Sequence, residues 1–210
     1  MSDLKSNLVA LKKVEVLEEV KNRAAEGEDP AKILIEAQGA MKTIGDKFQS
    51  GEFFLAELIL SSVIFKGISA ELKSYMGESN KQKPVAKIIL VTLKGDIHDI
   101  GKDLFGDLLS ARNFEVVDLG VDVDPRAVVD KVKEVKPDFL GFSALMTTTF
   151  QMMSKTAKLL EEEGLRDNLK LMVGGGVTTN QVKDMVGADF QTLDAMEGVN
   201  YCEQIVSGGN

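Results

Sequence analysis

This chain of 210 residues has no tryptophan and contains one histidine, one cysteine and four prolines. A single cysteine excludes an intramolecular disulfide and suits a reducing, cytoplasmic compartment. One histidine and one cysteine also exclude an ordinary protein zinc site, which needs several nitrogen, sulfur or oxygen ligands. No apolar run approaches the roughly 20 residues that span a bilayer, and the N-terminus shows no secretory signal. We therefore expect a cytoplasmic protein with no membrane partner.

Positive charge is also scarce, since 25 Lys and Arg face 33 Asp and Glu and the net charge is −8. Proteins that bind duplex nucleic acid use clustered Lys and Arg to displace counterions from phosphates. The lysines of this chain are scattered, so we expect no nucleic-acid partner. The hydrophobic fraction of 44% is ordinary for a globular protein.

The first part of the chain has helical periodicity. Apolar residues recur at helical spacing over Leu8–Val20, with a break near 10–13. Asp29 and Pro30 resemble an N-cap followed by a proline in the first turn. Further helices are predicted over Ala31–Phe48 and Leu55–Met76. Three or four such helices with short loops form a small antiparallel bundle.

A polar, turn-forming stretch over Gly77–Pro84 predicts a linker. We therefore expect a helical cap domain over residues 1–82 and a second domain over 83–210.

The second domain alternates between strand and helix patterns. Predicted strands are Val85–Thr92, Glu115–Leu119, Phe139–Ser143, Lys170–Val173 and Phe190–Leu193, and predicted helices are Lys102–Arg112, Pro125–Val135, Thr148–Glu163, Thr179–Val186 and Gly198–Val206. Apolar strands that alternate with helices favour a parallel sheet covered on both faces. The predicted fold class is α/β, a helical bundle followed by a flavodoxin-like (Rossmann-like), doubly wound five-stranded parallel sheet.

The single histidine, His98, follows the first predicted strand and stands between Asp96 and Asp99. A histidine in such a loop can ligate a metal while a carboxylate accepts the N–H of its other ring nitrogen. A surface or hydrogen-bonded core histidine is the simpler alternative. If His98 does bind a metal, a macrocyclic cofactor must supply most of the coordination.

Groups at three further predicted strand ends should meet His98 at one edge of the sheet, and the last of them is Asp194-Ala195-Met196. Gly174-Gly175-Gly176 suits close approach of a ligand to backbone, although a tight strand-to-helix turn has the same composition. The hydroxyl run from Ser143 to Thr149 could equally provide a helix N-cap. Neither group forms a phosphate-binding P-loop.

Together these elements resemble the B12-binding domain of corrinoid proteins. The family pattern D-x-H-x-x-G, S-x-L and G-G appears here as Asp96-Ile97-His98-Asp99-Ile100-Gly101, Ser143-Ala144-Leu145 and Gly174-Gly175. The stretch Gly51–Leu58 resembles the family's helical cap. The chain is similar to the corrinoid subunits of three-component methyltransferase systems, and to the cap and B12 modules of cobalamin-dependent methionine synthase.

The resemblance implies roles for individual residues. His98 becomes the lower axial ligand of cobalt, Asp96 bonds its other nitrogen, and Thr149 continues this relay. The cofactor's nucleotide tail then enters a slot lined by Gly101, Ser143, Leu145, Gly174 and Gly175. Further implied cofactor contacts are Ile97, Asp99, Ile100, Met146, Thr147, Gly176, Asp194, Ala195 and Met196. Phe54 and Leu58 would cover the upper face of the corrin, unless they are ordinary bundle core.

The implied cofactor is cobalamin or a related corrinoid, with histidine bound to cobalt. The implied function is to carry a methyl group between a substrate-specific methyltransferase and a second methyltransferase that uses tetrahydrofolate or a thiol coenzyme, and a reductive activase is a further expected partner. The chain would not be catalytic alone, since it holds no barrel for either reaction. Two alternatives remain, the small subunit of an adenosylcobalamin mutase and a B12-dependent sensor. The motifs do not distinguish methanol, methylamines, betaines and aryl methyl ethers as methyl donors.

Overall fold

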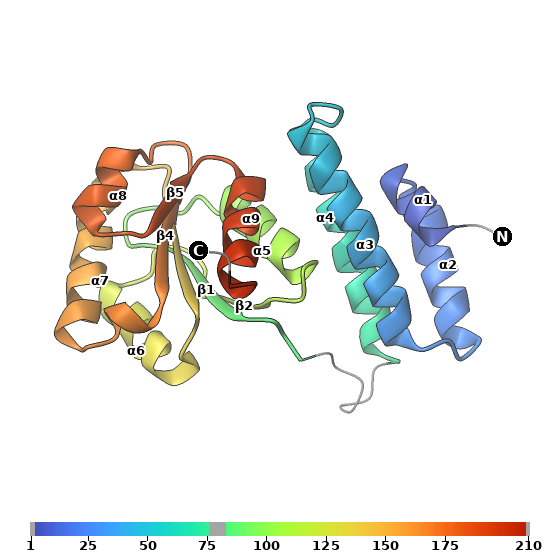
Figure 1. Ribbon diagram of the computed structural model, residues 1–210, viewed down its shortest axis with the longest axis horizontal. Helices are drawn as coiled ribbons and strands as arrows, with labels where there is room; N and C mark the ends of the chain where they lie inside the picture. The colour runs from blue at the N-terminus through green and yellow to red at the C-terminus, as the bar shows by residue number, and fades with distance from the viewer. Residues whose placement is uncertain (1–2, 76–82, 209–210) are drawn as a thin grey trace. The chain divides into compact units, whose positions relative to one another are not determined.

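The computed structural model describes residues 3–75 and 83–208. The chain divides into two compact units, a helical one formed by residues up to 83 together with 111–113, and an α/β one formed by 84–110 and 114 onward (Figure 1). Within the described residues, no helix combines the length and the apolar character needed to cross a bilayer.

The helical unit is built from α1 (Leu4–Val9), α2 (Lys13–Ala25), α3 (Pro30–Gln49) and α4 (Leu55–Lys73). The expected break between the first two helices falls at residues 10–12, where Leu11 adopts a left-handed conformation with φ of 57°. Helix α3 begins directly after Asp29, with Pro30 in its first turn. Helix α4 ends at Lys73, a little before the predicted Met76, which lies outside the described residues, as does most of the predicted linker.

The apolar stripes of these helices form the core of the unit. Ile33, Ala37, Met41 and Ile44 of α3 are buried, as the helical spacing predicts. On α4 the buried positions include Leu58, Ser62, Phe65 and Ile68. Burial of each large aliphatic side chain contributes about 1.5–3 kcal/mol, so this stripe is the main source of stability for the bundle.

The α/β unit contains a parallel sheet in the order β2-β1-β3-β4-β5. Its strands are β1 (Lys87–Thr92), β2 (Glu115–Asp118), β3 (Phe139–Ser143), β4 (Lys170–Gly174) and β5 (Phe190–Thr192). This is the flavodoxin-like strand order, and the chain reverses its direction of travel across the sheet between β1 and β3. The predicted fold class is confirmed, and the strand boundaries differ from the predicted ones by two residues at most.

Helices cover both faces of the sheet, but the two faces are packed differently. Helices α6 (Pro125–Val135), α7 (Phe150–Glu162) and α8 (Asn180–Val186) cover one face. A continuous apolar cluster lies beneath them and includes Ile89, Val91, Leu140, Phe142 and Val173.

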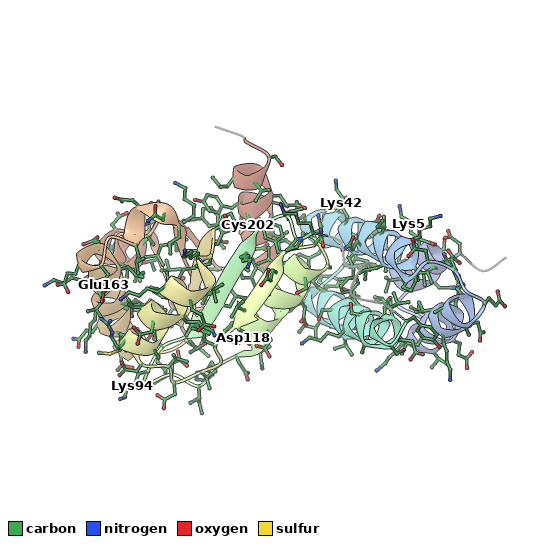
Figure 2. All side chains as sticks on the ribbon, turned by 90° about the horizontal axis from the view of Figure 1, so that it is seen from below. Lys5, Lys42, Lys94, Asp118, Glu163 and Cys202 are labelled. Carbon is green, nitrogen blue, oxygen red and sulfur yellow. The ribbon has the colours of Figure 1, made fainter. Side chains whose placement is uncertain are left out.

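The other face carries α5 (Ile100–Ser110) and α9 (Ala195–Val206), which lie alongside each other (Figure 1). The only cysteine of the sequence, Cys202 on α9, is fully buried here and packs against Met172 (Figure 2). Burial raises the pKa of its thiol to about 12, so Cys202 stays protonated near neutral pH and serves as a packing residue.

Candidate functional site

The carboxyl ends of four strands lie in one row. The strand register pairs Thr92 of β1 with Ser143 of β3, Ser143 with Gly174 of β4, and Gly174 with Thr192 of β5. The loops that follow these strands therefore leave the sheet side by side. The structure thus brings together the residue groups that the sequence placed at one edge, namely 96–101, 143–149, 174–176 and 194–196.

The centre of this edge is a carboxylate that joins two loops. Asp96 is 1% exposed, and its Oδ1 lies 2.6 Å from Nδ1 of His98 and accepts the His98 backbone N–H at 3.0 Å. Its Oδ2 accepts the backbone N–H groups of Leu145 at 2.7 Å and Met146 at 3.0 Å. One side chain therefore fixes the imidazole in the loop after β1 and ties that loop to the loop after β3.

The hydrogen bonds to Asp96 keep it ionised. Burial by itself would raise the pKa of this carboxyl, but the N–H groups of Leu145, His98 and Met146 outweigh burial and hold the pKa below its ordinary value. An ionised Asp96 accepts a hydrogen bond from Nδ1–H of His98. The other ring nitrogen, Nε2, then carries the lone pair, on a side chain that is 50% exposed.

Several further bonds hold the His98 loop against the sheet. The buried hydroxyl of Thr92 donates to the His98 carbonyl oxygen at 3.0 Å. Gly95, with φ of 95°, donates its N–H to Asp122 Oδ1 at 2.9 Å, and the Asp122 N–H donates to the Asp96 carbonyl at 3.0 Å. The loop is therefore positioned before any ligand binds, as a site of high precision requires.

The start of α5 is fixed by a buried lysine. Lys102 is 4% exposed, and its ammonium contacts Asp118 Oδ2 at 2.5 Å and Asp103 Oδ1 at 2.7 Å. Burial would lower the pKa of Lys102, but these two carboxylates reverse the effect and raise it. The ion pair joins the first turn of α5 to the end of β2, where Asp118 is labelled in Figure 2.

Large apolar side chains are exposed in the loops around His98. They come from three loops of the same edge and are Ile97, Ile100, Leu145, Met146 and Leu193, with exposures between 44% and 74%. Exposed apolar groups that gather on one surface mark a binding site. An exposed imidazole nitrogen with a free lone pair among apolar side chains suits a flat, largely apolar metal macrocycle.

The structure explains the glycines at positions 175 and 101 in different ways. Gly175 has φ of 103°, and a Cβ atom there would lie 2.2 Å from the carbonyl oxygen of Ala144, so the turn itself requires glycine. Gly101, in the first turn of α5, has no heavy atom within 4 Å of its Cβ direction. Since no side chain of the protein needs that space, Gly101 fits close approach of a ligand.

Thr149 does not contact Asp96 directly. Its buried hydroxyl donates to the Met146 carbonyl at 2.7 Å, within the short 3-10 helix Thr147–Thr149 that precedes α7. The Met146 N–H in turn donates to Asp96. Thr149 and Asp96 therefore bond to two different backbone groups of Met146, its carbonyl and its N–H, and the structure shows no direct hydroxyl–carboxylate bond between them.

The remaining predicted residues divide between exposed and structural positions. Asp99 is exposed beside His98. Asp194 caps α9, because its side chain accepts the Met196 N–H at 2.7 Å, and Met196 is buried. In the helical unit, Phe54 is 71% exposed whereas Leu58 is 1% exposed. Leu58 therefore belongs to the bundle core, which was the stated alternative, and Phe54 remains free to meet a ligand.

Sequence reasoning missed the residues that support this edge from below. They are Thr92, Lys102, Gly106, Gly141 and Gly198. The glycines carried a signal, because glycine inside a helix or strand suggests a close approach. No sequence pattern indicated the role of Lys102. Its partner Asp118 is distant in sequence, and its partner Asp103 resembles any other surface carboxylate.

Within residues 3–75 and 83–208, no group of three or more His, Cys, Asp or Glu side chains could hold a metal ion. The edge can therefore offer a metal one nitrogen, and a cofactor must bring the rest of the coordination.

The chain matches known families and known proteins over nearly its whole length. A family model described as the B12 binding domain matches residues 86–205, and a second model of the same description matches residues 2–73. A dimethylamine corrinoid protein from Methanosarcina barkeri is 36% identical over 209 residues, which cover 99% of this chain and 97% of the relative. A trimethylamine corrinoid protein from the same organism is 38% identical over 191 residues, 88% of this chain and 87% of the relative.

Solved structures show the same arrangement. A cobalamin-binding protein from Desulfitobacterium hafniense DCB-2 matches with a TM-score of 0.73 and 36% identity, over 96% of both chains. The methanol:cobalamin methyltransferase complex from Methanosarcina barkeri matches with a TM-score of 0.86 over 98% of this chain and 79% of that one. Its identity is 24%, so this likeness concerns the fold alone.

The glycine turn can be tested by a matched pair of substitutions. We expect Gly175→Ala to lower the free energy of unfolding of the α/β unit by about 2 kcal/mol or more, because it combines a strained φ with a backbone clash. Gly176→Ala should cost under about 1 kcal/mol, because its Cβ would meet only the end of the Leu145 side chain at 3.0 Å. Urea unfolding of both variants measures this difference, and equal losses would contradict it.

Proposed function

This chain belongs to the family of B12-binding corrinoid proteins, and from that premise we propose that it carries a methyl group on the cobalt of a bound corrinoid. The methyl group would arrive from a substrate-specific methyltransferase. A second methyltransferase would then pass it to tetrahydrofolate or a thiol coenzyme. The bound corrinoid would supply a cobalt centre that accepts and releases the methyl group.

The observation that carries this proposal is the Asp96–His98 pair at the exposed sheet edge. With Nδ1 held at 2.6 Å from a buried carboxylate, Nε2 of His98 is the nitrogen left to ligate cobalt from below. A carboxylate behind a ligating histidine fixes its tautomer and raises the basicity of the free nitrogen. The same contact holds the imidazole orientation, so His98 needs little rearrangement on binding.

The other residues of the edge would bind the rest of the cofactor. Ile97, Leu145 and Met146 offer apolar contacts to the corrin ring. The nucleotide tail would enter beside Gly101, where nothing obstructs it, and pass Ser143 and Gly174. Gly175 and Gly176 form the turn that closes this side, and the start of α9 at Asp194 and Ala195 borders the slot. These assignments rest on the resemblance to corrinoid proteins, and the position of the residues along the edge supports them.

Asp96 and Thr149 would couple ligation to proton movement. The ionised Asp96 would hold Nδ1–H of His98 through the 2.6 Å contact and would stabilise positive charge on the imidazole. Thr149 would act on Asp96 through the backbone of Met146, because its hydroxyl holds the Met146 carbonyl while the N–H of the same residue bonds the carboxylate. In this role Thr149 positions the carboxylate and does not exchange a proton with it.

The helical unit would serve as a cap that shields the methyl group from water. Its boundary would fall near residue 82, with the corrinoid-binding domain from 83 to 210. Phe54 is the side chain best suited to cover the upper face, because it is large, apolar and exposed. A cap of this kind must open for two methyltransferases in turn.

The carrier function is favoured over the two alternatives. Relatives that align with nearly the whole chain are corrinoid proteins named for dimethylamine and trimethylamine, and neither name is that of a mutase or a sensor. Methylated amines are accordingly the first donors to test. A reductive activase would restore cobalt after accidental oxidation, and the single cysteine is compatible with action in the cytoplasm.

Cofactor retention tests the proposal directly. We expect the full chain, incubated anaerobically with hydroxocobalamin and desalted, to retain it stoichiometrically. His98→Ala should still bind it, through the slot and the apolar edge, but with the absorption spectrum of cobalamin that has no protein ligand. Gly101→Leu should lose retention while the protein stays folded, because the new side chain enters the space beside the slot. A wild-type chain that elutes without cobalamin would contradict the proposal.

The role of Asp96 can be separated from general charge effects. We expect Asp96→Asn to lower the equilibrium constant for histidine ligation by about tenfold or more, as loss of a supporting carboxylate does in metal sites. Asp99→Asn is the matched control, since Asp99 stands on the other side of His98 and is exposed. The absorption spectra of bound cobalamin report the ligated fraction. If the two variants behaved alike, Asp96 would have no special role.

A further inference from the structure

The two helices on one face of the sheet both lead away from the cofactor edge. Helices α5 and α9 lie alongside each other (Figure 1), and both begin at the carboxyl edge, at Ile100 and Ala195. Gly198 follows the first residue of α9 by three residues and Phe105 follows the first residue of α5 by five, which places them roughly 4.5 Å and 7.5 Å along their helices from the edge. Phe105 also follows Gly101 at a spacing of four residues, so the two share one side of α5.

At that depth an aromatic ring covers bare backbone. A Cβ atom on Gly198 would lie 2.9 Å from Cε2 and 3.2 Å from Cζ of Phe105. Gly198 does not have a positive φ, so its helical conformation does not require glycine. Glycine inside a helix is less favourable than alanine by about 1 kcal/mol. Glycine at position 198 is therefore explained by the limited space beside the Phe105 ring and not by the backbone conformation.

The same face lacks side chains at several other positions. Gly106 of α5, Gly141 of β3 and Gly174 of β4 all belong to it. Leu90 fills the place of a side chain at Gly141, with its Cδ2 2.8 Å from the Cβ position. The opposite face has a continuous apolar cluster instead. The side-chain ends of Leu90 and Phe105 thus occupy the space over Gly141 and Gly198, and the end of a side chain can rotate to admit a ligand.

We propose that Phe105 and Gly198 set the width of the nucleotide slot and so determine which lower base of a corrinoid this chain accepts. The inference rests on the proposed function and adds a specificity determinant to it. The lower base is a flat aromatic heterocycle. Phe105 is half-buried, so its ring can turn away from Gly198 and stack against the base in an offset or edge-to-face arrangement.

This arrangement makes the slot selective by size. A bulky side chain at 198 would occupy the space into which the ring or the base must fit. Removal of the Phe105 ring would widen the slot and remove its stacking surface. Corrinoids with a larger, purine-type lower base should then bind more tightly relative to the corrinoid with dimethylbenzimidazole.

The experiment compares corrinoids that share a ring but differ in the tail. Hydroxocobalamin carries the dimethylbenzimidazole nucleotide, diaquocobinamide has no nucleotide, and the adenine-containing cobamide has a purine base. Binding of each to the full-length chain is measured by absorbance titration for wild type, Gly198→Leu and Phe105→Ala. Gln204→Leu is the matched control, because it introduces the same residue on the same helix at an exposed position.

We expect Gly198→Leu to weaken hydroxocobalamin binding by roughly tenfold or more, the size of effect that overpacking produces, and to leave cobinamide binding close to that of wild type. Cobinamide binding also shows that the variant is folded. Phe105→Ala should shift the preference between the two complete corrinoids toward the adenine form by roughly tenfold, a difference of one ring contact. Gln204→Leu should match wild type with all three.

Three results would overturn the inference while the proposed function stands. The first is a wild-type chain that retains hydroxocobalamin together with a Gly198→Leu variant that binds all three corrinoids as wild type does. The second is a Phe105→Ala variant with an unchanged preference between bases. Equal weakening of cobinamide and cobalamin by Gly198→Leu would also overturn it, because the effect would not depend on the tail. Failure of the wild-type chain to bind any corrinoid would overturn the proposed function and this inference together.

Discussion

The site depends on one carboxylate that is shared between two loops. Asp96 accepts N–H groups from its own loop at His98 and from the loop after β3 at Leu145 and Met146. A buried carboxylate would be costly without such partners, and these bonds both keep it ionised and align the two loops. The orientation of the imidazole, the exposure of Leu145 and Met146, and the position of Thr149 all follow from this contact.

The second constraint is the unequal packing of the two sheet faces. The α6–α8 face is filled by apolar side chains, and it supplies rigidity. The α5–α9 face is rich in glycine and is filled in part by Leu90 and Phe105, whose side-chain ends reach over bare backbone. A sheet that is firmly packed on one side and adaptable on the other can hold a rigid ligating histidine and still accept a long nucleotide tail beside it.

Much of the fold and part of the site could be predicted from the sequence. The strands were readable because each is a short apolar run bounded by turns, and parallel strands place their following loops at one edge. The Thr149 hydroxyl could not be assigned, because a local turn at Met146 competes for it. The ion pairs of Lys102 and the Phe105–Gly198 contact could not be predicted either. Each depends on how a helix packs against an element that is distant in sequence. Leu58 was ambiguous because bundle core and ligand contact require the same apolar residue.

The most direct test of the central claim uses the fact that the chain has one histidine. Protein grown with nitrogen-15 histidine carries the label at His98 alone, and the Co(II) form of bound cobalamin is examined by EPR beside unlabelled protein. If His98 ligates cobalt, the nitrogen splitting must change from a triplet to a doublet on labelling. A splitting that stays a triplet would show that the cofactor's own base is the ligand, and would contradict the account of the Asp96–His98 pair.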